Sequence, residues 1–465
     1  MRVILHRTGL LLLLLLMVME SAALAAAGAV SLNGVRYHGN ADRDRIVFDL
    51  SGLPQYEVKS SADGKSIVLE FANTQDAVKV KPAIQSEVIR QVSYAAADGK
   101  LRVTINLTDA QTYTVQKLAN PTRIFIDIQK EYEQSDVEEA APGLIHTHYF
   151  RRDARGNLSA HFLDVDLGRY KLDVGISNGI IQGRERLSHI SDDDNTLAAI
   201  NASYFNPDGS LMGITKTQGV IIGTMYIPRS AFAILADGRP AIGSIGYDGK
   251  VTIGKVTMPI WGVNCERTDD SLILYNSYFG DSTDTNEFGR EFVVQQGKVT
   301  AISPKDTAIP SDGVVISVNG ASRDAFTGVH VGDKVTIRED LGNPWNQATV
   351  IVGAGPTLVK GGQVKVTAQE EQFPADITRG RAPRTAVGIL PNGHVLLAVV
   401  DGRQDSSIGC TLTEMGELMK QFGAVDAINF DGGGSSEMVL GGQILNSPSD
   451  GVERPLGCAL GVLKK

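Results

Sequence analysis

Cysteine is scarce in this chain of 465 residues, which contains only Cys265, Cys410 and Cys458. Their spacing matches no zinc-binding pattern. An odd number of cysteines also leaves at least one thiol outside any disulfide in an oxidising compartment. A Cys410–Cys458 disulfide stays open on the sequence, which favours the simpler interpretation of three small, buried side chains. The cysteines therefore give no indication of a metal centre.

Runs of Lys or Arg are absent after the first few residues, and the formal net charge is −9. Nucleic acids and anionic membranes are bound through clustered positive charge, so neither is an expected partner. An anionic substrate would need a local group of Arg side chains to overcome the overall negative field. Hydrophobic residues make up 42% and charged residues 21%, which is typical of a soluble globular protein with roughly two to four domains.

Long apolar stretches are also lacking, since the run at residues 10–18 ends at Glu20, short of the roughly 20 residues that a membrane span needs. Basic residues precede this run, and small residues suited to cleavage follow at 21–25. We therefore expect residues 1–27 to be a cleaved signal peptide that leaves no membrane span, with an uncleaved anchor as the alternative. No Cys follows the small residues, which disfavours a lipoprotein.

Residues 28–130 have the pattern of a small antiparallel β-sandwich. Apolar and polar residues alternate in four segments, which are 46–50, 67–71, 101–107 and 124–128. A period of two is typical of half-buried strands. The sequence Ala-Asp-Gly-Lys occurs at 62–65 and at 97–100, and Asp-Gly suits turns that need positive φ.

The rest of the chain is expected to be one large α+β domain with a mixed sheet and few helices. Residues 131–142 are acidic, lack apolar periodicity and end in Pro, so we expect an acidic linker there. Residues 143–465 are rich in Gly and short apolar runs. The clearest helix is 412–422, where Thr411 and Glu414 form a capping box and Gly423 stands at the C-terminal end.

Charged residues follow two apolar strands in this domain. The strand 395–400 ends at Asp401-Gly402-Arg403, and the strand 425–430 ends at Asp431-Gly432-Gly433-Gly434-Ser435-Ser436. Arg384 opens a third strand. Consecutive glycines can direct several N–H groups at one anion or sugar oxygen, although a flexible turn is the simpler alternative. The sequence therefore predicts that these strand ends form one site.

These motifs resemble the phosphodiester glycosidase family, and the resemblance extends over about 300 residues in order. It rests on Asn429–Ser436 with Gly441, Asn446, Pro448–Gly451 and Glu453-Arg454, and on Asn201–Phe205, Gly280–Thr283, Gly353–Pro356, Arg384–Gly388, Asp401–Arg403 and Thr413–Met415. Position 204 is Tyr where many members have Phe. The segments 46–52, 66–71 and 121–128 resemble the AMIN domain, a module that holds envelope enzymes near peptidoglycan, with a generic spacer as the alternative.

Cleavage of a sugar-1-phosphodiester requires a carboxylate near the anomeric carbon and positive charge at the leaving phosphate. Asp401 and Asp431 are the candidate carboxylates, and Arg384 and Arg403 can each bind two phosphate oxygens. Glu414 is similar to an acidic residue of the family, and its capping role is an equally good interpretation.

Further residues are candidates for substrate binding. Asn201 could bond a sugar hydroxyl or N-acetyl group, with a structural turn as the alternative, and Tyr204 or Phe205 could stack on the pyranose. Asp450 and Arg454 could pair near the site or merely at the surface. The candidate binding residues are thus Asn201, Tyr204, Phe205, Arg403, Gly432, Gly433, Gly434, Ser435 and Asp450.

No cofactor or metal is expected. His146 and His148 lie on one strand face without a third ligand, so we expect them to face solvent. The acidic segment 192–195 does not have the spacing of an EF-hand loop, which favours an exposed turn.

The sequence thus favours an exported cell-envelope hydrolase that cleaves a glycosyl-1-phosphodiester in a surface glycan or exopolysaccharide. The N-terminal module would hold it near peptidoglycan. The alternative is a glycan-binding scaffold that keeps the fold without catalysis. A zinc amidase is weakly supported, because the few His residues of the large domain are scattered.

Overall fold

The computed structural model describes residues 29–153, 155–225 and 227–465, and the chain divides into two compact units, Met1–Lys130 and Glu131–Lys465. Residues 1–27, expected to form a signal peptide, lie outside the described residues. In the described part strands predominate. The α-helices found there are α1 (Leu187–Ile190), α2 (Gly320–Ala325), α3 (Ala375–Thr378) and α4 (Leu412–Gln421). The expected α+β class with few helices is confirmed.

The first unit consists of two sheets that share one core. One sheet has the order β5-β1-β2-β9-β8 and the other β3-β4-β7-β6. Their strands are β1 (Val30–Gly39), β2 (Arg43–Leu50), β3 (Tyr56–Ser60), β4 (Ser66–Ala72), β5 (Thr74–Asp76), β6 (Ile89–Ala97), β7 (Lys100–Leu107), β8 (Tyr113–Ala119) and β9 (Thr122–Gln129). All pairs are antiparallel except β1–β5.

The alternating residues of the first unit point into the space between its sheets. Phe48 on β2 and Phe71 on β4 are fully buried, and their ring centroids lie 5.5 Å apart. Gly64 and Gly99 have positive φ in the two expected turns. The predicted sandwich is therefore confirmed, because strands with a period of two bury one face against the opposite sheet.

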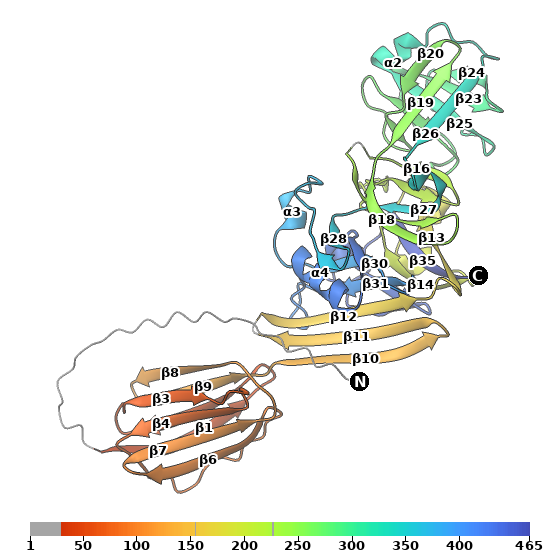
Figure 1. The fold of residues 1–465 in the computed structure, drawn as a ribbon. Helices are drawn as coiled ribbons and strands as arrows, with labels where there is room; N and C mark the ends of the chain where they lie inside the picture. Colours follow the sequence, from red (N-terminus) through yellow and green to blue (C-terminus); the bar gives the residue numbers. More distant parts are fainter. Residues whose placement is uncertain (1–28, 154, 226) are drawn as a thin grey trace. The chain divides into compact units, whose positions relative to one another are not determined.

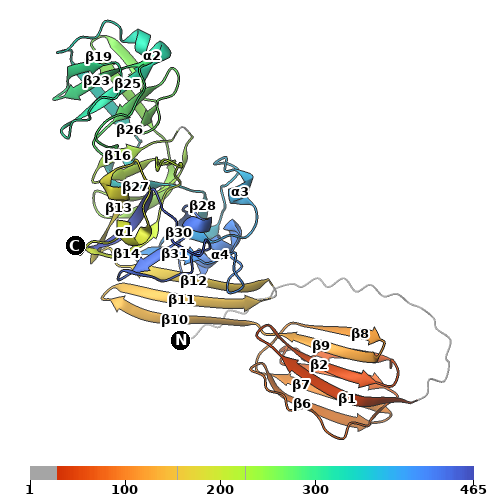
Figure 2. The same ribbon diagram turned by 180° about the vertical axis from the view of Figure 1, so that it is seen from behind.

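The second unit is built around an eight-stranded sheet with the order β10-β11-β12-β31-β30-β32-β28-β29 (Figure 1). Its strands are β10 (Tyr132–Ala141), β11 (Leu144–Asp153), β12 (Gly156–Val165), β28 (Thr357–Lys360), β29 (Gln363–Val364), β30 (Arg384–Ile389), β31 (Val395–Val400) and β32 (Asp426–Asn429). A second sheet, of which β13 and β14 are labelled in Figure 2, has the order β13-β35-β14-β33-β34. It comprises β13 (Tyr170–Ile176), β14 (Thr196–Asn201), β33 (Met438–Leu440), β34 (Gln443–Ile444) and β35 (Cys458–Lys464).

Residues expected to be an acidic linker form strand β10 instead. This strand pairs with β11 along almost its whole length, and nearly all its side chains are exposed. An edge strand that is exposed on both faces needs no apolar alternation, so the sequence pattern did not reveal it. Its four acidic side chains are typical of edges that must not pair with other chains.

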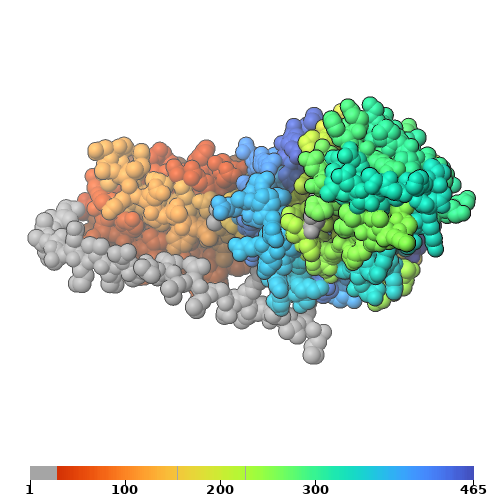
Figure 3. Space-filling model, turned by 90° about the horizontal axis from the view of Figure 1, so that it is seen from above, coloured from red at the N-terminus to blue at the C-terminus, as the bar shows by residue number. Residues whose placement is uncertain are grey.

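Three further sheets complete the second unit. One has the order β16-β15-β27-β17-β18, with β15 (Thr215–Thr217), β16 (Val220–Gly223), β17 (Arg229–Leu235), β18 (Pro240–Ile245) and β27 (Ala348–Gly353). The others contain β19 (Asp248–Ile253), β20 (Val256–Pro259) and β26 (Val335–Asp340), and β21 (Gly262–Val263), β22 (Leu272–Tyr275), β23 (Gly289–Gln295), β24 (Lys298–Ser303) and β25 (Gly313–Asn319). We call residues 246–341 the inserted subdomain; it appears in green and teal in Figure 3.

Helix α4 begins at Leu412, as the sequence predicts, and ends at Gln421, one residue before the predicted end. Thr411 and Glu414 form the capping box, and Gly423 has φ of 95° just after the helix. The buried face consists mainly of Leu412, Met415, Leu418 and Met419. None of the three cysteines is in a disulfide; Cys410 and Cys458 are buried, and Cys265 is partly exposed. In the described part of the chain, no helix has the length and apolar character to cross a membrane.

Candidate functional site

Three adjacent central strands of the eight-stranded sheet each have one terminus at the same end of the sheet. Strand β30 is the neighbour of both β31 and β32, and it runs antiparallel to each. Arg384 at the start of β30 therefore lies opposite Val400, directly before Asp401. The turn after β32 lies against the same strand start, because Phe430 N donates to Thr385 O at 2.8 Å. The topology thus brings Arg384, Asp401 and Asp431 to the same end of the sheet, as the sequence predicts.

Residues 431–436, which follow β32 and are called the glycine turn, are held in place by Asn201. The Asn201 amide donates to Asp431 O at 2.7 Å, and its oxygen accepts bonds from Thr385 Oγ1 at 2.7 Å and Glu437 N at 3.1 Å. Asn201 is only 1% exposed. Its place differs from the expected contact with a sugar, because its polar atoms already bond three segments of the protein.

Glycine is required in this turn because charged side chains come close to its backbone. A Cβ atom at Gly434 would overlap the Arg454 guanidinium and the Asp450 carboxylate. Gly433 has φ of 64°, and a Cβ there would lie 3.3 Å from Arg403 Nη2. The Arg454–Asp450 ion pair, at 2.7 Å, therefore lies beside the turn rather than elsewhere on the surface. The exposed Arg403 guanidinium is the other positive charge at this place.

Arg384 differs from the expectation that it contacts phosphate directly. Its side chain is buried, and it donates to main-chain carbonyls, at 3.2 Å to Cys410 O and 3.0 Å to Ile377 O. Burial lowers the pKa of its guanidinium. None of the ion pairs found among the described residues includes Arg384. Its role is therefore to tie together the segments beside the turn.

The two candidate carboxylates have different surroundings. Asp401 is 5% exposed, and its Oδ1 accepts bonds from Asn446 Nδ2 at 3.1 Å and Ser447 N at 2.9 Å. Burial raises the pKa of its carboxyl group. Asp431 is partly exposed, and its Oδ1 accepts a bond from Gly432 N at 2.8 Å.

Asp431 has the clearer electrostatic signature of the two. Burial raises the pKa of Asp431 to about 6, while bonds from Ser435 and Gly432 and the charge of Arg454 act in the opposite direction. A carboxyl group with a pKa in this range can change its charge near neutral pH. Asp431 therefore combines partial access to solvent with nearby positive charge.

Glu414 is fully engaged as the cap of helix α4. Its Oε2 accepts a bond from Thr411 N at 2.9 Å, and its Oε1 contacts Arg155 Nη1 at 2.8 Å. Arg381 also pairs with Oε1. Both carboxylate oxygens thus have structural partners, which favours the capping interpretation over a direct role at the substrate.

The aromatic pair lies next to the glycine turn. The Tyr204 hydroxyl donates to Gly355 O at 3.0 Å and accepts a bond from Asn429 Nδ2 at 3.1 Å. Burial, together with the charge of Asp431, raises its pKa. Phe205 packs against Gly457, where a Cβ atom would meet the Phe205 side chain. Both residues are partly buried, and the Tyr204 ring packs against Phe373 with ring centroids 5.8 Å apart.

Sequence reasoning missed Glu437, which follows the glycine turn and is 1% exposed. Burial, with the nearby Glu453 carboxylate, raises the pKa of Glu437 to about 8. Its Oε1 has no hydrogen-bond partner, and neither do the buried Ser436 Oγ and Asn429 Oδ1. Such atoms are costly to bury, so they indicate a place where water or a ligand group completes the bonding. The only sequence signal was a carboxylate directly before the apolar residues 438–440.

Three histidines form a cluster in which His146 and His161 are buried and His148 is partly buried, which corrects the expectation that His146 and His148 face solvent. His146 Nε2 lies 3.0 Å from His161 Nδ1, and His148 stacks on His161 with ring centroids 4.0 Å apart. The pairing of β11 with β12 brings them together, which sequence spacing alone does not show. In the described residues no group of three or more His, Cys, Asp or Glu side chains has the arrangement of a metal site. The acidic segment 192–195 is a turn in which Asp193 accepts backbone bonds.

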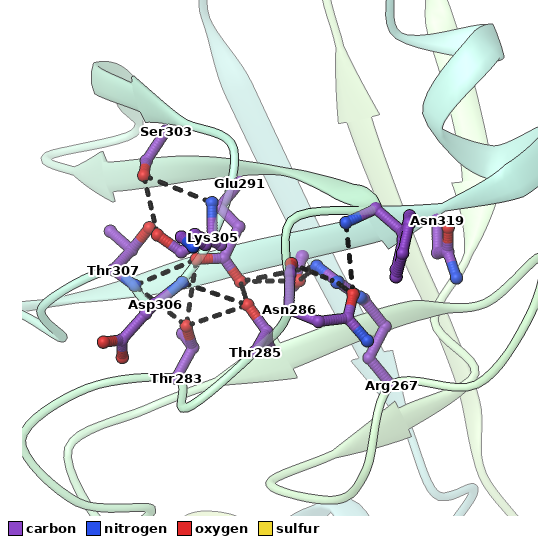
Figure 4. Close-up of polar contacts among 12 residues, drawn as sticks. Arg267, Thr283, Thr285, Asn286, Glu291, Ser303, Lys305, Asp306, Thr307 and Asn319 are labelled. Carbon is purple, nitrogen blue, oxygen red and sulfur yellow. Dashed lines mark hydrogen bonds and ion pairs between the residues drawn. The ribbon is translucent and has the colours of Figure 1, made fainter.

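Thr283, the last residue of the segment Gly280–Thr283 that carried part of the resemblance, belongs to a buried network in the inserted subdomain (Figure 4). Glu291 is fully buried, and it accepts bonds from Thr283 Oγ1 at 2.9 Å and Ser317 Oγ at 2.7 Å. Arg267 lies 3.7 Å from the same carboxylate. This network connects the loops of the subdomain, so Thr283 has a structural role.

Comparison with known proteins agrees with the motifs. A family model described as phosphodiester glycosidase matches residues 288–463, and the AMIN domain model matches residues 34–109 and 91–139. The mouse N-acetylglucosamine-1-phosphodiester alpha-N-acetylglucosaminidase is 28% identical over 155 residues, which cover 30% of this chain and 30% of the mouse protein. The chain thus spans less than a third of the length of this curated relative.

Two solved structures share the fold. A hypothetical protein from Synechocystis superposes with a TM-score of 0.66 and 23% identity, covering 94% of this chain and 81% of the other. A structure from Burkholderia pseudomallei gives a TM-score of 0.59 and 20% identity, covering 89% and 97%. At this identity the likeness concerns the fold alone. The resemblance of the sequence motifs is confirmed by the family matches: residues 34–139 are similar to AMIN domains, and residues 288–463 are similar to the phosphodiester glycosidase family.

Proposed function

We propose that this protein is an exported cell-envelope hydrolase that cleaves a glycosyl-1-phosphodiester bond in a surface glycan or exopolysaccharide. The single observation that carries the proposal is the Asp431 turn, where a partly exposed carboxylate with a raised pKa lies beside two arginines. The AMIN domain would keep the enzyme near peptidoglycan, with which such domains are associated.

The reaction needs two kinds of charge at neighbouring places. The exposed Arg403 guanidinium, assisted by Arg454, would neutralise the phosphate as it leaves. Asp431 would stabilise positive charge at the anomeric carbon or activate water. The buried Glu437, protonated near neutral pH, could hydrogen-bond a ligand group with the carboxyl oxygen that lacks a partner. Asp401 and Arg384 would position the surrounding loops.

The test is hydrolysis of methyl phospho-N-acetylglucosaminide and a UDP-sugar by the purified protein. Asp431→Asn is expected to lower kcat by at least about 100-fold, while the melting temperature stays nearly unchanged. Asp405→Asn is the matched control, because Asp405 is exposed and lies in the loop after Arg403. An inert wild-type protein on a broad panel of glycosyl phosphodiesters would end the enzymatic proposal.

A glycan-binding scaffold is the second candidate function. The observation in its favour is that Asn201, Arg384 and Glu414 all have structural partners, which leaves fewer groups for catalysis. Binding of glycosyl phosphodiesters that persists in Asp431→Asn, without hydrolysis by the wild type, would support this function.

A further inference from the structure

A cavity of about 500 Å³ opens between the loop 206–212 and the inserted subdomain. Thr224 and Met225, which follow β16, line it on one side, and Cys265 and Glu266, which follow β21, line it on another. Its volume lies within the range of small-molecule sites. None of the residues proposed to act on the phosphodiester lines it.

The loop that forms one wall of the cavity is continuous with the candidate site. Asp431 N donates to Ala202 O at 3.0 Å, so the chain just before this loop is bonded to the glycine turn. The loop then leaves through Tyr204 and closes on itself where Met212 N donates to Tyr204 O at 2.8 Å. The wall of the cavity thus follows, along the chain, directly after the segment that is bonded to the glycine turn.

The cavity has chemistry opposite to that of the glycine turn. Among the described residues, its lining includes two carboxylates, Asp208 and Glu266, and no Lys or Arg. Asp208 Oδ1 accepts hydrogen bonds from Ser210 N at 3.0 Å and from Ser210 Oγ at 2.7 Å, and these bonds hold that wall of the cavity in place. Negative charge of this kind repels phosphate, whereas carboxylate oxygens accept bonds from sugar hydroxyls.

Apolar side chains supply the second requirement for a sugar. Leu211, Met212 and Met225 line the same cavity and offer surface for the C–H face of a pyranose ring. We propose that this cavity binds a sugar residue without negative charge, in the part of the glycan beyond the cleaved phosphodiester. This inference rests on the proposed function for the identity of the substrate.

Cys265 provides a reporter that does not depend on catalysis. It is partly exposed in the cavity wall, whereas Cys410 and Cys458 are at most 1% exposed. A maleimide added to the full chain should therefore modify Cys265 first. An uncharged N-acetylglucosamine tetrasaccharide is expected to slow this modification by about tenfold at saturation. N-acetylglucosamine-1-phosphate should protect less.

Two variants and one control test the assignment. Met212→Trp, which fills the cavity, and Glu266→Gln, which removes an acceptor charge, should weaken tetrasaccharide binding by about tenfold, as measured by calorimetry. Glu287→Gln is the control, because Glu287 is exposed in the same subdomain and does not line the cavity. For a phosphodiester with an extended glycan, Met212→Trp should raise KM and leave cleavage of the methyl phosphodiester unchanged.

Absence of both protection and binding by the wild type would overturn the inference, as would stronger protection by the sugar phosphate. Equal effects of Met212→Trp on long and short substrates would overturn it too. If the tetrasaccharide protects Cys265 but no phosphodiester is cleaved, the cavity assignment stands and the proposed hydrolysis fails. If a phosphodiester is cleaved but the tetrasaccharide does not protect Cys265, the proposed hydrolysis stands and the cavity assignment fails.

Discussion

At the scale of single residues, Asp431 is the group whose charge state matters most. Its carboxylate would act in the ionised form, and its pKa is raised to about 6 by burial. We therefore expect kcat/KM on the methyl phosphodiester to fall as the pH drops through about 6, because protonation removes the negative charge that faces the anomeric carbon. The measurement is a pH–rate profile between pH 4.5 and 8.

The variant Arg454→Gln tests whether the acidic limb of the pH–rate profile, where kcat/KM falls with falling pH, reflects the titration of Asp431. The Arg454 charge lowers the pKa of Asp431, so its removal should move the midpoint to higher pH. Loss of the ion pair also leaves Asp450 negative beside the turn, which acts in the same direction. A midpoint that stays in place or moves to lower pH would assign the limb to another group.

The sequence predicted where the site lies better than what each residue does there. A carboxylate after each of two buried strands, and three glycines after one of them, depend on local patterns that one segment reveals. The partners of Asn201 and Arg384 come from segments that lie far away in the chain, at 377, 385, 410 and 431–437. Only the folded sheet shows that these polar side chains are occupied.

At the scale of elements, helix α4 separates a structural from a catalytic role for Glu414. Thr411→Ala should lower the free energy of unfolding by about 1 kcal/mol, because it removes one half of the capping box. Glu414→Gln should destabilise as well, since it weakens the pairs with Arg155 and Arg381. Both variants should keep the wild-type kcat per folded molecule, as measured by urea unfolding and hydrolysis.

Glu417→Gln is the control for that series, because Glu417 is exposed on the same helix. It should change the free energy of unfolding by no more than a few tenths of a kcal/mol. A large loss of kcat in Glu414→Gln without a matching loss of stability would show that Glu414 acts in the reaction after all.

The pairing of strands β11 and β12 has a consequence for stability at acidic pH. His161 is 4% exposed between His146 and His148, and burial with these neighbours lowers its pKa from 6.5 to about 3. The unfolded state binds a proton below pH 6.5, whereas the folded state leaves His161 neutral. The contribution of neutral His161 to the free energy of unfolding is therefore complete above pH 6.5 and is lost as the pH falls toward 3. At pH 5 the loss is on the order of 2 kcal/mol.

His161→Gln should flatten the fall in stability between pH 7.5 and pH 5 relative to the wild type. Both tryptophans of the chain, Trp261 and Trp345, lie in the second unit, so their fluorescence during urea unfolding reports that unit. His330→Gln, at an exposed position, should leave the dependence unchanged. Equal slopes for His161→Gln and the wild type would contradict the buried neutral histidine.

At the scale of the whole molecule, the two units have separate hydrophobic cores. The first unit encloses a core of residues between Leu32 and Ile128, and the cores of the second unit are formed by residues after 143. The sequence predicted this division because alternating strands stop near residue 130. It did not predict strand β10, which lengthens the second unit to residue 131.

Because each unit has its own core, residues 131–465 should fold and act without the first unit. We expect this segment to cleave the methyl phosphodiester with a kcat/KM within about twofold of the longer chain, since every residue proposed to act lies in it. It should start at residue 131, because removal of β10 would expose the edge of β11.

Cosedimentation with peptidoglycan sacculi should be lost from this segment and kept by residues 29–130, which contain most of the AMIN match. A segment 143–465 that folds equally well would contradict the role of β10. Sacculus binding by residues 131–465 alone would show that the second unit, rather than the first, holds the protein at the cell wall.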